Sequence, residues 1–153
     1  NYLFLTKTAF FNGLSENEIK TILNCFGAYQ KSFKKSKLFL HGDTVSDMGL
    51  VLSGSVNIVS TIIGVAVNIQ PLSQGEIFAE TYATIPNKEM LCDVVAAEKT
   101  EVLFINVEKV LSVCENQCSF HNRLLRNLLK NSAQKNISLA TRMMHTASKF
   151  IRE

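Results

Sequence analysis

The chain has 153 residues, of which 46% are hydrophobic, so it is long enough for one domain that buries roughly 70% of its unfolded surface. Its 16 basic and 13 acidic residues give a net charge of +3, which is too small to indicate nucleic-acid binding by the chain as a whole. No apolar run reaches the roughly 18 residues that span a bilayer, and we predict no membrane association. The four cysteines occur without a secretory hydrophobic segment, which favours a reducing, cytoplasmic location.

A short helix is predicted near the N-terminus. Ser15 and Glu18 form a Ser-x-x-Glu capping box, which satisfies backbone N–H groups where a helix begins. Ile19 and Ile22 follow at helical spacing, and Gly27 is typical of a left-handed stop. We therefore predict one short leading helix between residues 15 and 27.

Residues 28–105 predict β-structure. Short segments rich in Val, Ile, Phe and Thr are separated at intervals of roughly 8 to 12 residues by Gly42, Gly49, Gly54, Gly64, Gly75 and Pro86. Gly54 predicts a tight turn between two short strands. The apolar runs 94–97 and 102–105 flank residues 98–100 and predict the core strands of a closing hairpin. This spacing is typical of a sandwich or barrel.

After residue 107 the hydrophobic period becomes helical. A short helical turn is followed by Ser119, a predicted N-cap, and by a long stretch without Gly or Pro. A helix of about 27 residues is about 40 Å long, which exceeds what a barrel of this size can cover. We predict that its apolar stripe forms a parallel homodimer, with the contact through Leu125, Leu129, Ala133, Ile137, Ala140 and Met144. The basic residues of this segment are interpreted as a solvated helix face.

Catalytic and metal-binding patterns are weak. The three histidines do not form the closely spaced pair of a metal-dependent cupin enzyme, and no G-x-S-x-G, Walker or H-E-x-x-H motif occurs, so we predict that the chain is not an enzyme. Cys114, Cys118 and His121 are clustered, but the spacing is not that of a zinc knuckle and no fourth ligand lies nearby. We interpret the two cysteines as buried small residues and His121 as a surface histidine. A redox or metal sensor stays open as an alternative.

Five segments carry a resemblance to the effector domain of the Crp/Fnr family of bacterial transcription regulators. They are residues 11–15 (FNGLS), 40–43 (LHGD), 51–56 (VLSGSV), 75–80 (GEIFAE) and 148–153 (SKFIRE). The resemblance implies a mainly β fold, a double-stranded β-helix jelly roll of the cyclic nucleotide-binding type, with short N-terminal helices and a long C-terminal dimerisation helix. Residues 114–129 further resemble a clostridial subgroup whose members do not obviously use cyclic AMP.

The resemblance also implies a domain organisation and partners. Residues 1–118 would be the effector-sensing barrel with its leading helix, residues 119–147 the dimerisation helix, and residues 148–153 the start of a hinge. The DNA-binding domain that follows in the family is absent, so we expect a fragment that reaches operator DNA only through that missing domain. A homodimer and an unknown small-molecule effector are the expected partners, and RNA polymerase stays open for the full-length protein.

In cyclic-nucleotide members of the family, a glutamate binds the ribose hydroxyl and an arginine binds the phosphate. Residue by residue, the first motif falls on Phe78, Ala79, Glu80 and Thr81, and the arginine position falls on Met90, followed by Leu91 and Cys92. Counting along the long helix adds Lys135 and Asn136 to this effector pocket. Met90 cannot form the bidentate contact of an arginine, so binding of cyclic AMP is not expected. The apolar wall of Met90, Leu91 and Cys92 either contacts an uncharged or aromatic effector or simply fills the cavity with core side chains. The identity of the effector stays unknown.

We therefore predict the effector-binding and dimerisation domain of a Crp/Fnr-like transcription regulator. The alternatives are a stand-alone small-molecule or cyclic-nucleotide-binding module, and a redox or metal sensor through Cys114, Cys118 and His121. A cyclic-nucleotide module of the kinase or channel type would retain the arginine that Met90 replaces.

Overall fold

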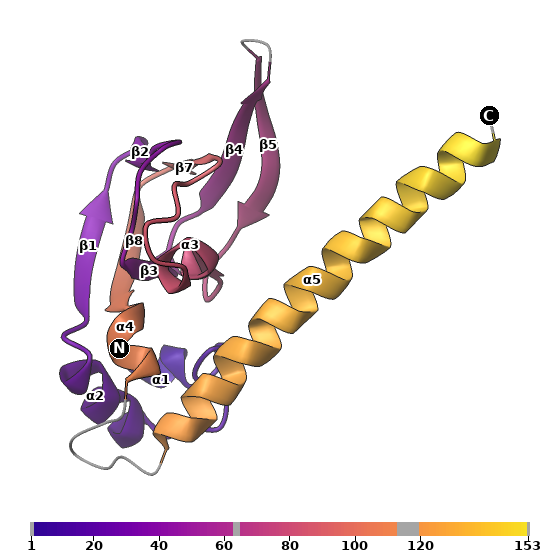
Figure 1. The fold of residues 1–153 in the computed structure, drawn as a ribbon. Coiled ribbons are helices and arrows are strands. Elements are labelled where there is room, and N and C mark those ends of the chain that lie inside the picture. The colour runs from indigo at the N-terminus through magenta and orange to yellow at the C-terminus, as the bar shows by residue number, and fades with distance from the viewer. Residues whose placement is uncertain (1, 63–64, 113–119, 153) are drawn as a thin grey trace.

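The computed structural model describes residues 2–62, 65–112 and 120–152, and within them it forms a β-sandwich with helices at one end (Figure 1). Two short helices, α1 (Tyr2–Leu5) and α2 (Glu16–Cys25), precede the strands. The predicted capping box is present at α2, where the Ser15 side chain accepts from the Glu18 N–H and Glu18 accepts from the Ser15 N–H. Gly27 follows α2 with a φ of +60°, as the sequence predicts for a left-handed stop.

The strands form two antiparallel four-stranded sheets in the described residues. The first sheet has the order β1-β8-β3-β6 and comprises β1 (Tyr29–Phe33), β8 (Thr100–Asn106), β3 (Asp47–Ser53) and β6 (Ile77–Phe78). The second has the order β2-β7-β4-β5 and comprises β2 (Lys37–Phe39), β7 (Asp93–Ala96), β4 (Val56–Ile62) and β5 (Val65–Leu72). This arrangement of two packed antiparallel sheets fits the predicted double-stranded β-helix jelly roll.

The predicted hairpin of residues 94–105 is wrong. β7 and β8 are consecutive in the chain, but they belong to different sheets, because β7 pairs with β2 and β4 whereas β8 pairs with β1 and β3. Both strands are core strands, as their apolar runs indicate. On β8, Val102 and Phe104 face the second sheet, whereas Leu103 and Ile105 face the helices. The run is continuously apolar because both faces of this sheet are covered.

Gly49 was predicted to separate strands, and the structure instead places it inside β3. A Cβ built on Gly49 would lie 2.2 Å from Cζ of Phe78. The glycine therefore allows the Phe78 ring to pack directly on the strand. Gly54 joins β3 to β4 with a φ of +85°, and this turn carries the chain from one sheet to the other.

Three further helices complete the fold: α3 (Glu80–Thr84), α4 (Val107–Leu111) and α5 (His121–Arg152). The 32 residues of α5 make it about 48 Å long. Its first turns pack against the core through the buried Leu124 and Leu128, whereas its C-terminal half extends away from the sandwich (Figure 1). The helix is longer than predicted, and its predicted N-cap Ser119 lies outside the described residues. In the described part of the chain, no helix combines the length and apolar character required to cross a membrane.

Candidate functional site

The centre of the candidate site is Glu80, the first residue of α3. β6 brings the chain into the core at Phe78, and Ala79 then turns it with a φ of 65°, which is unusual for a residue with a side chain. This turn places Glu80 inside the protein, where only 3% of its surface is exposed. A buried carboxylate requires a positive charge or several hydrogen-bond donors.

α5 supplies these groups to Glu80. Lys135 Nζ forms an ion pair with Glu80 Oε1 and also donates to the Ile77 carbonyl at 3.2 Å. Asn131, one helical turn earlier on the same face, donates its Nδ2–H to Glu80 Oε1 at 3.5 Å. The other oxygen, Oε2, is buried and has no hydrogen-bond partner among the described residues. Glu80 therefore connects α3 to α5 and keeps one acceptor available for a further donor.

Other residues of the predicted pocket lie in different surroundings. Met90 is 2% exposed and packs in the core between the two sheets, and Thr81 and Asn136 are exposed to solvent. Leu91 is 60% exposed. It lines a cavity of about 140 Å³ with the half-buried Cys92, beside β4. The structure thus joins Glu80 to Lys135, while Met90 fills core space.

An ion pair between Asp93 and Lys37 lies beside this cavity, which Asp93 helps to line. The Asp93 carboxylate accepts the His41 backbone N–H at 2.7 Å and pairs with Lys37 at 3.1 Å. These contacts, the His41 hydrogen bond first, hold the pKa of Asp93 below its ordinary value. Burial, and then the negative charge of Asp93, raise the pKa of the Cys92 thiol. Cys92 is accordingly poorly suited to act as a thiolate nucleophile.

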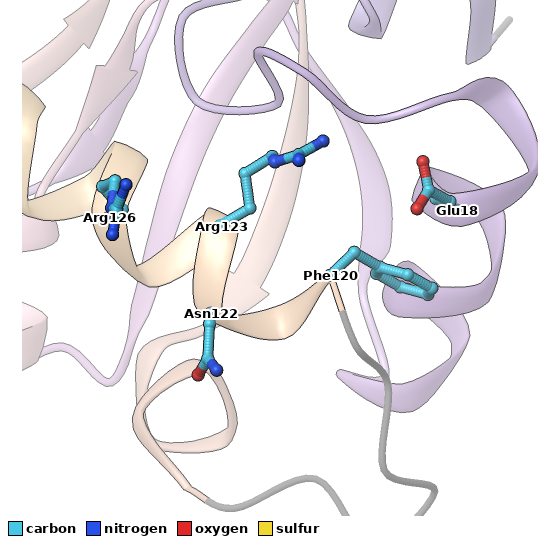
Figure 2. Close-up of a pocket in the computed structure, with 5 residues that line it drawn as sticks. All are labelled: Glu18, Phe120, Asn122, Arg123 and Arg126. Atoms are coloured by element: carbon cyan, nitrogen blue, oxygen red, sulfur yellow. The ribbon is translucent and has the colours of Figure 1, made fainter.

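A separate basic cavity of about 320 Å³ lies between α2 and the beginning of α5, and Figure 2 shows the five side chains that line it. They are Glu18, Phe120, Asn122, Arg123 and Arg126. Arg123 donates to the Gly13 carbonyl, so it ties α5 to the segment before α2. Both arginines are exposed, as expected for the solvated helix face that the sequence predicts.

Only part of the proposed soft-ligand cluster lies within the described residues. His121 is buried, and its ring nitrogen Nε2 contacts the Val110 carbonyl, while the ring packs edge-on against Phe26 at 5.4 Å. The prediction of a surface histidine is therefore wrong, because α4 and α2 cover the ring. Cys114 and Cys118 lie outside the described residues. Among the residues that the structure describes, no group of three metal-binding side chains occurs.

Comparison with known families identifies the domain. A model of the cyclic nucleotide-binding domain family matches residues 30–117, more than half of the chain. The chain belongs to the cyclic nucleotide-binding domain family. The predicted jelly roll of the cyclic nucleotide-binding type is thereby confirmed. None of the curated proteins compared with the sequence matches it.

Solved structures with the same fold include transcription regulators. The catabolite activator protein of Thermus thermophilus is 24% identical, with a TM-score of 0.69 over 90% of this chain and 63% of its own. A cyclic nucleotide-binding domain from Methylobacillus flagellatus is 19% identical, with a TM-score of 0.76 over 94% and 80%. The sensor domain of the regulator DNR from Pseudomonas aeruginosa is 15% identical, with a TM-score of 0.64 over 95% and 90%. The chain thus spans less than two thirds of the length of the Thermus regulator but most of the length of the Pseudomonas sensor domain.

Proposed function

We propose that this domain is the effector-sensing and dimerisation region of a Crp/Fnr-like DNA-binding transcription regulator. The observation that carries the proposal is the buried ion pair between Glu80 on α3 and Lys135 on α5. It joins the segment that would contact an effector to the helix that extends away from the sandwich. An effector that donates to the unpaired Oε2 of Glu80 would neutralise part of the carboxylate charge, weaken the ion pair with Lys135 and so shift the position of α5.

The proposed regulator does not bind cyclic AMP through an arginine–phosphate contact. Met90 stands where the resemblance places that arginine, and its side chain is only 2% exposed. Without a bidentate pair, cyclic AMP would bind about two to four decades more weakly. Isothermal titration calorimetry with cyclic AMP should therefore show no saturable binding at micromolar concentration, and saturable micromolar binding would contradict this part of the proposal.

The exposed apolar side chains of α5 support a homodimer. Leu129 is 70% exposed, and Ile137 and Met144 are each 66% exposed, whereas Leu125 is half-buried against the chain's own core. Side chains of this size on one helix stripe are typical of a surface covered by a second chain. Analytical ultracentrifugation at micromolar concentration should show a dimer.

A matched pair of variants tests the helix contact. I137D places a charge on the apolar stripe and should yield a monomer, because a buried unpaired carboxylate is strongly unfavourable. S138D adds the same charge at the adjacent exposed position and should leave the dimer intact. A monomeric wild-type protein, or equal dissociation in both variants, would contradict dimerisation through this stripe.

The regulatory role requires a DNA-binding domain, and the protein isolated from its native source tests for one. A polypeptide larger than 17.1 kDa by the mass of such a domain, which retards its own promoter DNA, is the expected result. A native mass of 17.1 kDa would instead favour a stand-alone ligand-binding or dimerising module.

A further inference from the structure

A third cavity opens at the edge of the sandwich, and Glu80 is not among the residues that line it. It has a volume of about 260 Å³ and lies between β1 and β2, which are the terminal strands of the two sheets. Four aromatic rings line it, from Tyr29, Phe33, Phe39 and Phe104. Because no further strand of the described residues lies beside β1 or β2, this edge of the sandwich is where the space between the sheets meets solvent.

The Phe104 ring forms the base of the cavity, and the other three rings pack against it. Phe104 is 4% exposed, and Tyr29 stacks on it with a centroid separation of 5.3 Å. Phe33 and Phe39 approach Phe104 at steep interplanar angles, 74° and 68°, with centroids 6.1 Å away in each case. Aromatic faces carry negative electrostatic potential, so a set of rings around one cavity favours a cation as well as an apolar group.

A carboxylate stands at the same cavity. Asp47, the first residue of β3, is half-buried and accepts hydrogen bonds from the Tyr29 hydroxyl at 3.0 Å and from the Asn106 amide at 3.3 Å. Within residues 2–62, 65–112 and 120–152 it forms no ion pair. Its negative charge is therefore balanced by neutral donors alone, and a cation in the cavity would be attracted to it.

The pKa of the Tyr29 phenol is consistent with an Asp47 charge that no cation of the described residues neutralises. Burial, and then the hydrogen bond and negative charge of Asp47, raise the pKa of the Tyr29 phenol above its ordinary value. The phenol therefore stays protonated and donates to Asp47 at neutral pH.

Lys31 supplies a cation at the rim. Its Nζ lies 5.2 Å from the centroid of the Phe33 ring, which is the geometry of a cation–π contact. Lys31 is exposed and does not pair with Asp47, so it covers one ring face without neutralising the carboxylate. A positively charged ligand would meet repulsion from Lys31 and attraction from Asp47.

We propose that this cavity binds a small organic ammonium ion that carries an apolar ring, with the ammonium group beside Asp47 and the ring against Phe104. An apolar cavity of about 150 Å³ accommodates benzene. The larger space here leaves room for one ring and a short aminoalkyl group. The site is separate from the effector pocket proposed above and does not depend on that proposal.

Benzylamine is a suitable probe because benzyl alcohol has nearly the same shape without the charge, and benzoate has the opposite charge. The three compounds are titrated into the isotope-labelled protein and followed by NMR. Benzylamine should shift the signals of Tyr29, Phe33 and Phe104 saturably, and it should bind at least about tenfold more tightly than benzyl alcohol. This comparison uses the wild-type protein alone, so it does not depend on the stability of any variant.

Two substitutions with opposite expected effects on benzylamine affinity then test the charges of Asp47 and Lys31. D47N keeps the shape and should weaken benzylamine binding by about tenfold or more. K31M removes the repulsion and should strengthen it by about two- to fivefold. D43N is the control, because Asp43 is an exposed aspartate in the loop before β3, outside the residues that line the cavity.

Four results would contradict the proposal or the role that it gives to Asp47. One is equal binding of benzylamine and benzyl alcohol, which would indicate a merely apolar cavity. Another is tighter binding of benzoate, which would assign the site to Lys31 and an aromatic acid. The third is an absence of saturation up to roughly 10 mM benzylamine. A D47N protein that folds, as judged by circular dichroism, and binds benzylamine like the wild type would equally contradict the role of Asp47.

Discussion

Replacement of Lys135 by methionine should destabilise the protein more than a substitution at an ordinary exposed position of α5. Methionine keeps most of the side-chain volume and has nearly the same helix propensity as lysine, so the substitution mainly removes the charge. Glu80 would then remain buried, with the Asn131 amide as its only side-chain partner among the described residues. The effect therefore measures the cost of a carboxylate left without its counter-ion.

The magnitude follows from the exposure of the two partners. Removing one member of a fully buried ion pair costs about 3–5 kcal/mol. The Glu80 side chain is only 4% exposed, but that of Lys135 is 36% exposed, so water screens the pair and can enter when lysine is lost. We therefore expect K135M to lower the free energy of unfolding by about 2–3 kcal/mol. For a chain of this length that corresponds to a decrease in Tm of roughly 5–10 °C.

Urea unfolding followed by far-UV circular dichroism measures this change, because the chain contains no tryptophan for fluorescence. All variants are compared at one protein concentration, since a dimer would couple stability to concentration. K130M, at an exposed position of the same helix, is the matched control and should change stability by less than about 0.5 kcal/mol.

The double variant E80Q/K135M tests the cause. It removes both charges, so it should be more stable than K135M by at least about 1 kcal/mol. If K135M lost no more stability than K130M, or if E80Q/K135M were less stable than K135M, the buried-carboxylate reasoning would be refuted.

Two further predictions concern packing and acid stability. G49A should lose about 2–4 kcal/mol because its new Cβ would meet the Phe78 ring at 2.2 Å. G42A, where a Cβ meets nothing within 4 Å, should lose only about 1 kcal/mol through its φ of +93°, and equal losses in urea unfolding would contradict this contrast. Asp93 has a folded-state pKa below its unfolded value, so its contribution is present above the unfolded pKa and is lost as the pH falls through the folded pKa. The wild type should therefore begin to lose its stability advantage over D93N as the pH falls toward the unfolded-state pKa of about 4, and should lose the rest as the pH falls through the lower folded-state pKa, whereas parallel pH curves would contradict a contribution from the Asp93 charge.

Local patterns predicted several elements because their causes are local. The capping box of α2 uses two residues three positions apart, and the same contact forms wherever that helix is placed. The uninterrupted run before the C-terminus indicated a long helix, and α5 occupies that stretch. The apolar run of residues 102–105 indicated a core strand, and β8 is a core strand, covered on both faces in the structure.

The candidate site was predicted in part. The resemblance placed Glu80 and Lys135 in one pocket, and the structure brings these two residues into contact. Asn131 was missed, although its position one turn before Lys135 could have indicated it. Met90 and Leu91 are adjacent in sequence but end in opposite environments, 2% and 60% exposed, and no local pattern distinguishes them.

By itself, the sequence determined the strand-rich character of the chain, its leading helix and its long terminal helix, since these depend on propensity, capping and hydrophobic period. Only the tertiary structure decided which strands pair, because β7 and β8 are neighbours in the chain and yet belong to different sheets. It also decided that Gly49 accommodates a ring instead of making a turn. Both outcomes depend on contacts between segments far apart in the chain, and the Glu80–Lys135 pair, which spans 55 residues, arises in the same way.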